Sequence, residues 1–213
     1  MPDPSFEGRV VDEETFLCIL GEAIDALEGH ELPYVFIGGI ASALHGRPRW
    51  TRDLDLFVRP EDARPTLDAL VGAGFSTQQT DPFWLFKAIK QGVLVDIIFR
   101  STGDIYLDDE MLSRSTIKEF KGRRLRVVSP EDLLVIKAVV HDEKTPRHWY
   151  DALGILAHSE LDWEYLMRRA RRAARRVLSL LLYAQSNDLL VPHSVVQELF
   201  AMVSESGENT RSA

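Results

Sequence analysis

Apolar and polar residues follow one another along the first 128 positions in patterns that predict short helices and strands in turn. Over residues 12–29 the apolar side chains recur every three or four positions, which is the spacing of one helix face, and Asp12 precedes them as a plausible cap. The run Tyr34–Ile37 is apolar throughout and ends in glycines, which favours a short buried strand. Further helices are predicted at 40–45, 60–70 and 104–113, and strands at 53–58, 75–79, 83–89, 93–99, 115–120 and 123–128.

From Ser129 onward the pattern becomes helical. Ser129 is followed by a proline and two acids, which is the composition of a capped helix start. An arginine-rich helix is predicted at 168–176 and a last helix at 192–203. We therefore expect an α+β fold, with a mostly antiparallel or mixed sheet flanked by helices and a helical region after it. The predicted domains are 1–128 (α+β) and 129–205 (helical), with a polar, disordered tail at 206–213.

Two glycines and two aspartates lie on either side of a predicted short helix. Gly38 and Gly39 allow backbone N–H groups to approach an anion closely, and a helix N-terminus favours phosphate. Side chains alternate along a strand, so Asp53 and Asp55 share one face. Adjacent carboxylates repel each other unless a cation lies between them, and their hard oxygens suit Mg²⁺ or Mn²⁺. The pattern favours phosphoryl or nucleotidyl transfer; the alternative is an ordinary turn followed by a solvated strand face.

A third carboxylate interrupts the strongly apolar run at 93–99. Asp96 shares its strand face with Leu94 and Ile98, and an unpaired carboxylate on an apolar face is costly. If this strand lies beside the strand of Asp53 and Asp55, three carboxylates converge and could hold two ions. A simple salt bridge between Asp96 and an arginine is the alternative.

These motifs resemble the DNA-polymerase-β-like nucleotidyltransferase superfamily, in which a glycine pair precedes Asp-x-Asp and a third aspartate follows on a later strand. The residues that carry the resemblance are Gly38-Gly39, Asp53-Leu54-Asp55 and Asp96. The residues around Asp-x-Asp, with Arg49 and Thr51, look like the minimal branch that includes AbiEii-type toxins of abortive-infection and toxin–antitoxin systems.

The resemblance implies transfer of a nucleoside monophosphate from an NTP substrate to a hydroxyl acceptor. The three aspartates would be the catalytic residues and would bind Mg²⁺ or Mn²⁺, while Gly38 and Gly39 would bind the NTP phosphates. In toxin relatives the acceptor is the 3′ end of tRNA, so the implied partners are tRNA or another RNA and a cognate antitoxin. Protein hydroxyls and small-molecule antibiotics are acceptors elsewhere in the superfamily.

Three further residues are candidates for nucleotide binding. Arg52 belongs to a basic loop just before Asp53, where it either supports a triphosphate or balances the aspartates. Lys137 lies in a largely apolar helix, and the resemblance places such a lysine against the nucleotide phosphates. Asp151 matches the later aspartate of a family helix motif in which His148 replaces a frequent aspartate, and it would orient or pair with Lys137 or Arg147.

Arginines crowd the segment predicted as a helix at 168–176. Like charges so close destabilise an isolated helix, which favours a polyanionic partner; a solvated outer face is the alternative. The residues predicted to bind RNA, at helical spacing on one face, are Arg168, Arg172, Arg175 and Arg176.

Composition limits the remaining possibilities. The formal net charge is −8, which argues against a general nucleic-acid coat. Cys18 is the only cysteine, which excludes an intramolecular disulfide and a cysteine zinc site, and its apolar neighbours predict that it is buried. The first residues lack a signal sequence and no apolar run would span a membrane, so we expect a cytoplasmic protein with no membrane partner.

The sequence therefore predicts a metal-dependent nucleotidyltransferase. A second interpretation is a catalytically silent nucleotide-binding or antitoxin-like module that regulates a partner. A third, a structural interaction protein that uses its basic helix, leaves the three aspartates unexplained.

Overall fold

The computed structural model describes residues 11–77 and 81–208, and these form two compact units. The first unit runs through residue 40, from 50 to 100 and from 106 to 127. The second takes in 41–49 and 101–105 and begins its longest segment at 128. Residues 1–10, on which the expectation about a signal sequence depended, lie outside the described part, as do 78–79 of a predicted strand and 209–213 of the predicted tail. The division of the chain into domains at residue 128 stays a prediction.

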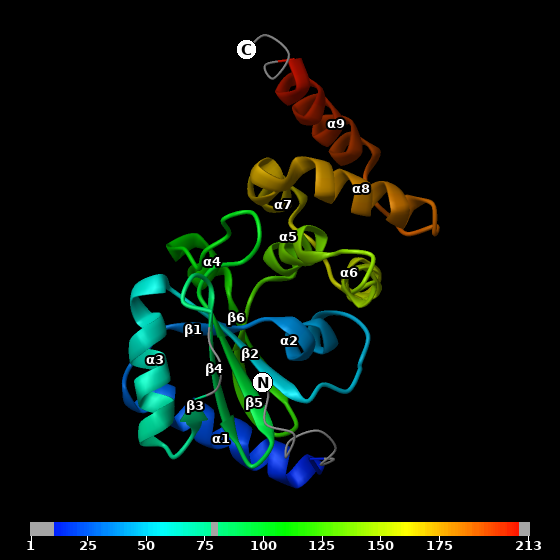
Figure 1. Cartoon of the computed structure of the whole chain (residues 1–213). Coiled ribbons are helices and arrows are strands. Elements are labelled where there is room, and N and C mark those ends of the chain that lie inside the picture. Colours follow the sequence, from blue (N-terminus) through cyan, green and yellow to red (C-terminus); the bar gives the residue numbers. More distant parts are fainter. Residues whose placement is uncertain (1–10, 78–80, 209–213) are drawn as a thin grey trace. The chain divides into compact units, whose positions relative to one another are not determined.

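A mixed sheet lies at the centre of the first unit (Figure 1). Its seven strands follow the order β3-β4-β5-β2-β1-β7-β6. β1 pairs with β7, and β2 with β5, in parallel, whereas the other neighbours are antiparallel. The predicted α+β class with a mixed sheet and flanking helices is confirmed. The strands are β1 (Tyr34–Phe36), β2 (Asp53–Val58), β3 (Ser76–Thr77), β4 (Leu85–Lys90), β5 (Val93–Ile98), β6 (Thr116–Phe120) and β7 (Arg123–Val127).

Alternation along the central strands separates a covered face from a more open one. In β5, Val93, Val95 and Ile97 are buried, while the residues between them are half-buried. Helix α3 (Pro60–Gly72) packs on β4 and β5, and α1 (Glu13–Gly29) packs on α3. The Asp12 side chain accepts a hydrogen bond from Thr15 N at 2.8 Å, so the predicted cap of α1 is confirmed.

The second unit consists of helices. Its core contains Tyr165, Leu133 and Ile155, all fully buried. The Ser129 side chain accepts from Asp132 N and caps α5, as predicted. The helices are α5 (Pro130–Val140), α6 (Arg147–His158), α7 (Trp163–Ala170), α8 (Ala174–Gln185) and α9 (His193–Glu208); α2 (Gly38–His45) begins in the first unit and ends in the second.

Three details of the sequence analysis are corrected. The helix predicted at 104–113 is α4 (Asp109–Arg114), because Asp108 caps it and places the acids in its first turn. Cys18 is exposed, since it lies off the apolar stripe of α1. Helix α9 extends to Glu208, beyond the predicted end at 203, so residues 206–208 are helical where the tail was expected.

Within the described ranges, no helix combines the length and the apolar character that crossing a membrane would require.

Candidate functional site

Three aspartates lie on the same face of the sheet in the first unit. Asp55 of β2 is directly opposite Asp96 of β5 in the parallel register, and Asp53 is opposite Leu94, two positions earlier. Alternation puts these three carboxylates on the more open face, and Leu54 between the β2 aspartates is fully buried on the other. The structure therefore brings Asp53, Asp55 and Asp96 onto two adjacent strands.

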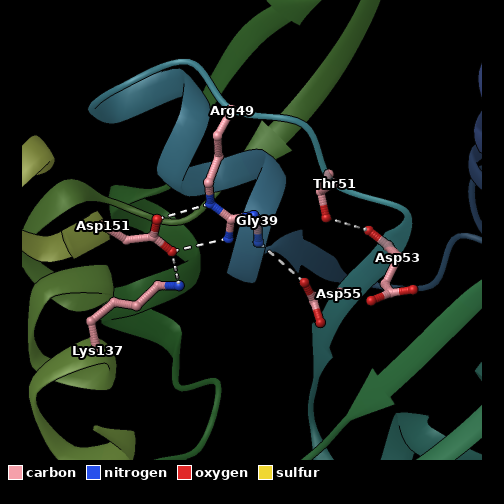
Figure 2. Close-up of polar contacts among 7 residues, drawn as sticks. All are labelled: Gly39, Arg49, Thr51, Asp53, Asp55, Lys137 and Asp151. Atoms are coloured by element: carbon pink, nitrogen blue, oxygen red, sulfur yellow. Dashed lines mark hydrogen bonds and ion pairs between the residues drawn. The ribbon is translucent and has the colours of Figure 1, made fainter. Parts of the chain in front are cut away.

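The glycine turn lies directly against one of these carboxylates. Gly38 has a φ of 61°, which favours glycine, and a Cβ placed there would be 1.9 Å from Asp55 Oδ2. Gly39 N donates to Asp55 Oδ2 at 3.2 Å (Figure 2), and Ile37 N donates to the Asp55 backbone carbonyl at 3.0 Å. The Gly39 N–H that we expect to bind phosphate thus donates to a carboxylate here. Phosphate binding by the two glycines stays a prediction.

Asp96 has a cationic partner that the sequence analysis missed. Lys87 of β4 is opposite Asp96 in the antiparallel register, and its Nζ donates to Asp96 Oδ1 at 2.6 Å. Burial raises the pKa of the Asp96 carboxyl; Lys87 opposes this rise and the charge of Asp53 adds to it. A signal was available, because counting back from a two-residue turn at Gln91-Gly92 pairs position 87 with position 96.

The side chains present fit a divalent ion only in part. Asp53 and Asp55 offer hard carboxylate oxygens from one strand face, which is the donor type that Mg²⁺ and Mn²⁺ prefer. Asp96 bonds to Lys87 instead, and among the described residues no group of three acidic, histidine or cysteine side chains is arranged to hold a metal. The assignment of all three aspartates as metal ligands stays a prediction.

A second charged cluster lies within the helical unit. Lys137 Nζ donates to Asp151 Oδ2 at 2.8 Å. Arg49 donates to both carboxylate oxygens of Asp151, from Nε to Oδ1 at 2.8 Å and from Nη2 to Oδ2 at 3.0 Å (Figure 2). The Lys137 and Asp151 side chains are only 4% and 2% exposed. Burial would raise the pKa of Asp151, but the hydrogen bonds and charges of Arg49 and Lys137 hold it below its ordinary value. Of the two partners considered for Asp151, Lys137 and Arg147, the structure shows the pair with Lys137, and Arg49 is a further partner. A contact between Lys137 and nucleotide stays a prediction.

The arginine-rich segment is not one helix, so the predicted helical spacing of Arg168, Arg172, Arg175 and Arg176 is wrong. The helix is interrupted after α7 by a 3-10 turn (Arg171–Ala173), because Ala173, with a φ of −132°, leaves the helical region before α8 begins. All four arginines are exposed, whereas Arg169 turns toward the buried carboxylate of Asp132 at 2.6 Å. Their binding of RNA is untested by this geometry, as is nucleotide binding by Arg52, which is exposed just before β2.

Comparison with known proteins points to one class. Residues 6–190 match the model of a family described as uncharacterised nucleotidyltransferase. Among curated proteins, no match was found. The chain is similar in fold to the solution structure of the antibiotic-resistance factor ANT(2'')-Ia, with a TM-score of 0.53 and 20% identity over 83% of this chain and 94% of that one. A crystal structure of ANT(2'')-Ia in complex with adenylyl-2''-tobramycin gives a TM-score of 0.51 and 18% identity over 80% of this chain and 97% of that one.

Proposed function

The chain belongs to the family described as uncharacterised nucleotidyltransferase, and from this premise we propose that it transfers a nucleoside monophosphate from an NTP to a hydroxyl group of an acceptor. The observation that carries the proposal is the register of β2 and β5, which sets Asp55 opposite Asp96. The glycine turn that touches Asp55 adds to it, because a phosphate-binding backbone then adjoins carboxylates on the same sheet face.

Each residue on this face has a role in the proposal. Gly38 and Gly39 bind the β- and γ-phosphates, and this requires the Gly39 N–H to exchange Asp55 for a phosphate oxygen. Asp53 and Asp55 hold Mg²⁺ or Mn²⁺, which supplies charge neutralisation at the phosphates and lowers the pKa of the acceptor hydroxyl when bound. Asp96 serves the acceptor side of the site.

The reaction in this proposal is an in-line displacement. The acceptor oxygen forms a bond to the α-phosphorus, the bond from that phosphorus to the pyrophosphate oxygen breaks, and the hydroxyl proton leaves to solvent. The side chains contribute by positioning the reactants and by electrostatic stabilisation, since phosphoryl transfer needs little covalent chemistry from the protein.

For the acceptor we propose RNA, including tRNA 3′ ends. The resemblance around Asp53 and Asp55 to AbiEii-type toxins supports it, and so does the exposure of Arg172, Arg175 and Arg176. In this proposal the protein acts in the cytoplasm and a partner encoded beside it restrains it. A small-molecule acceptor is the competing class, because the similar fold of ANT(2'')-Ia occurs with adenylyl-2''-tobramycin.

Nucleotide binding is the first test, and it needs no knowledge of the acceptor. Thermal unfolding is followed with each NTP, with and without Mn²⁺, for the wild type and for Asp53→Asn/Asp55→Asn. A ligand at about 100 times its Kd stabilises by about 2.7 kcal/mol. A metal-dependent rise in Tm that the double variant loses supports the proposal. No rise with any NTP contradicts it and favours a partner-binding module without catalysis.

Transfer is the second test, with α-³²P-labelled NTPs and either total tRNA or tobramycin as acceptor. We expect label on RNA, and Asp96→Asn should abolish labelling while the NTP-dependent rise in Tm persists. Normal transfer by Asp96→Asn would remove that residue from the site.

Charge reversal tests the RNA surface. Arg172→Glu/Arg175→Glu should weaken tRNA binding and flatten its dependence on salt. Arg64→Glu is the control, because Arg64 is 72% exposed and pairs within its own helix with Asp68.

A further inference from the structure

One of the three aspartates already has a positive charge bonded to it. Lys87 Nζ lies 2.6 Å from Asp96 Oδ1, and the two side chains are 27% and 18% exposed. A charge-assisted hydrogen bond of this length in a half-buried position is stronger than one between exposed groups. Neither Asp53 nor Asp55 has a lysine opposite it in the register, since β2 lies between β5 and β1.

The pairing of Lys87 with Asp96 is fixed by the backbone. Gln91 and Gly92 connect β4 to β5 and both have positive φ, 49° and 84°, as a tight two-residue hairpin turn requires. The turn sets the register, and a slip by one residue would move every side chain of β4 to the other face. The geometry of the hairpin therefore places Lys87 opposite Asp96, whichever conformation its side chain adopts.

A second lysine on β4 shows what a purely structural lysine looks like in this hairpin. Lys90 lies on the helix-covered face, where its Nζ bonds to Glu22 of α1 and to the carbonyl of Ala73. Its side chain is 22% exposed, close to the value for Lys87. The two lysines share a strand and a degree of burial, but only Lys87 faces the aspartates.

We propose, on the basis of the function proposed above, that Lys87 is a built-in cation of the site, so that the aspartates bind one divalent ion, at Asp53 and Asp55, instead of two. Three carboxylates carry three negative charges, and the ammonium group leaves two, which one divalent ion balances. Asp96 is held by Lys87 and positioned by it, and the ammonium repels a second ion from this carboxylate. Lys87 is in this sense a positioning residue.

The number of bound ions tests the proposal without any need for activity. Free Mn²⁺ is measured by electron paramagnetic resonance during titration of the protein with Mn²⁺ alone. We expect one tightly bound ion per chain in the wild type and two in Lys87→Met, because a second ion should bind to the wild type at least about tenfold more weakly than to the variant. Lys87→Arg keeps the charge and Lys90→Met removes the matched lysine, so both should bind one ion. Lys87→Met/Asp96→Asn should return to one, because the second site needs the carboxylate.

Thermal unfolding provides the second readout and confirms that each variant is folded. Without metal, Lys87→Met leaves the Asp96 carboxylate unpaired and should lower Tm. Added Mn²⁺ should then raise the Tm of Lys87→Met more than that of the wild type or of Lys90→Met, which a structural role alone does not predict.

The outcomes separate the two proposals. If Lys87→Met still binds one ion, or if the wild type binds two, the role of Lys87 is wrong and the proposed function stands. If the wild type binds no Mn²⁺, or if its binding survives in Asp53→Asn/Asp55→Asn, both are wrong.

Discussion

Gly38 and the Asp55 carboxylate occupy neighbouring space so closely that a methyl group at Gly38 would lie 1.9 Å from Oδ2 and 2.3 Å from Cγ. The glycine turn and the aspartate strand therefore pack directly against each other. Gly39 and Asp55, which are joined by a hydrogen bond, are 16 positions apart in the sequence. Any side chain at position 38 must displace the carboxylate or the turn.

Gly38→Ala should therefore damage both stability and nucleotide binding. The positive φ of Gly38 alone costs a non-glycine residue about 1–2 kcal/mol, and the clash with Asp55 adds to it. We expect a loss of about 2 kcal/mol or more in urea unfolding and no NTP-dependent rise in Tm. Gly72→Ala is the control: a Cβ there meets nothing within 4 Å, and alanine should leave stability equal or up to about 1 kcal/mol higher. Equal effects of the two substitutions would contradict this account of the turn.

Asp151 should contribute more to stability than Lys137 does. Asp151→Asn leaves the buried Lys137 and the half-buried Arg49 facing a neutral amide, which costs about 3–5 kcal/mol. Lys137→Met leaves the two-pronged bond from Arg49 in place, so its cost should be closer to about 1.5–3 kcal/mol. Urea unfolding of both variants measures the order. A cost for Lys137→Met that equals or exceeds the cost for Asp151→Asn would show that Arg49 does not compensate the carboxylate.

His148 should make the protein less stable below neutral pH. Burial lowers the pKa of His148 to about 4, and the charges of Lys137, Arg147 and His141 act in the same direction against that of Asp151. The unfolded chain, with an ordinary pKa of 6.5, then binds the proton more tightly than the folded chain. The contribution to stability is full above pH 6.5 and disappears as pH falls toward about 4. Because the ring is partly exposed, we expect about 1–2 kcal/mol.

Urea unfolding at pH 7.5 and pH 4.5 checks this prediction by comparing the wild type with His148→Gln. The wild type should lose more stability than the variant between the two pH values. Parallel losses would assign the acid sensitivity to other groups.

Tyr165 should stabilise the helical unit through its hydroxyl group. The hydroxyl donates to Asp132 Oδ2 at 2.6 Å, while Arg169 Nε donates to Oδ1 at 2.6 Å. Burial raises the pKa of Asp132, and each hydrogen bond to its charged form offsets part of this effect. Tyr165→Phe should cost about 1.5–3 kcal/mol in urea unfolding. The same change at Tyr183, which is 44% exposed, should stay within about 0.5 kcal/mol.

Local patterns in the sequence were sufficient for the elements that depend on neighbouring residues. Asp12 caps α1 and Ser129 caps α5 as predicted, because a cap is a contact over three residues. The common face of Asp53 and Asp55 also follows from alternation within one strand. The sequence by itself thus determined the mixed α+β class and the two strands on which the aspartates lie.

Only the tertiary structure decided which charges meet. Lys87 reaches Asp96 through a strand register, and Arg49 reaches Asp151 across 102 residues, so no local spacing reveals that second pair. The arginine segment is interrupted by the 3-10 turn at Arg171–Ala173. Arg169 of α7 pairs with the buried Asp132 of α5, whereas the arginines on either side of it are exposed. Capping and alternation are set by nearest neighbours along the chain, whereas the partner of a buried charge is set by whatever the folded chain brings beside it.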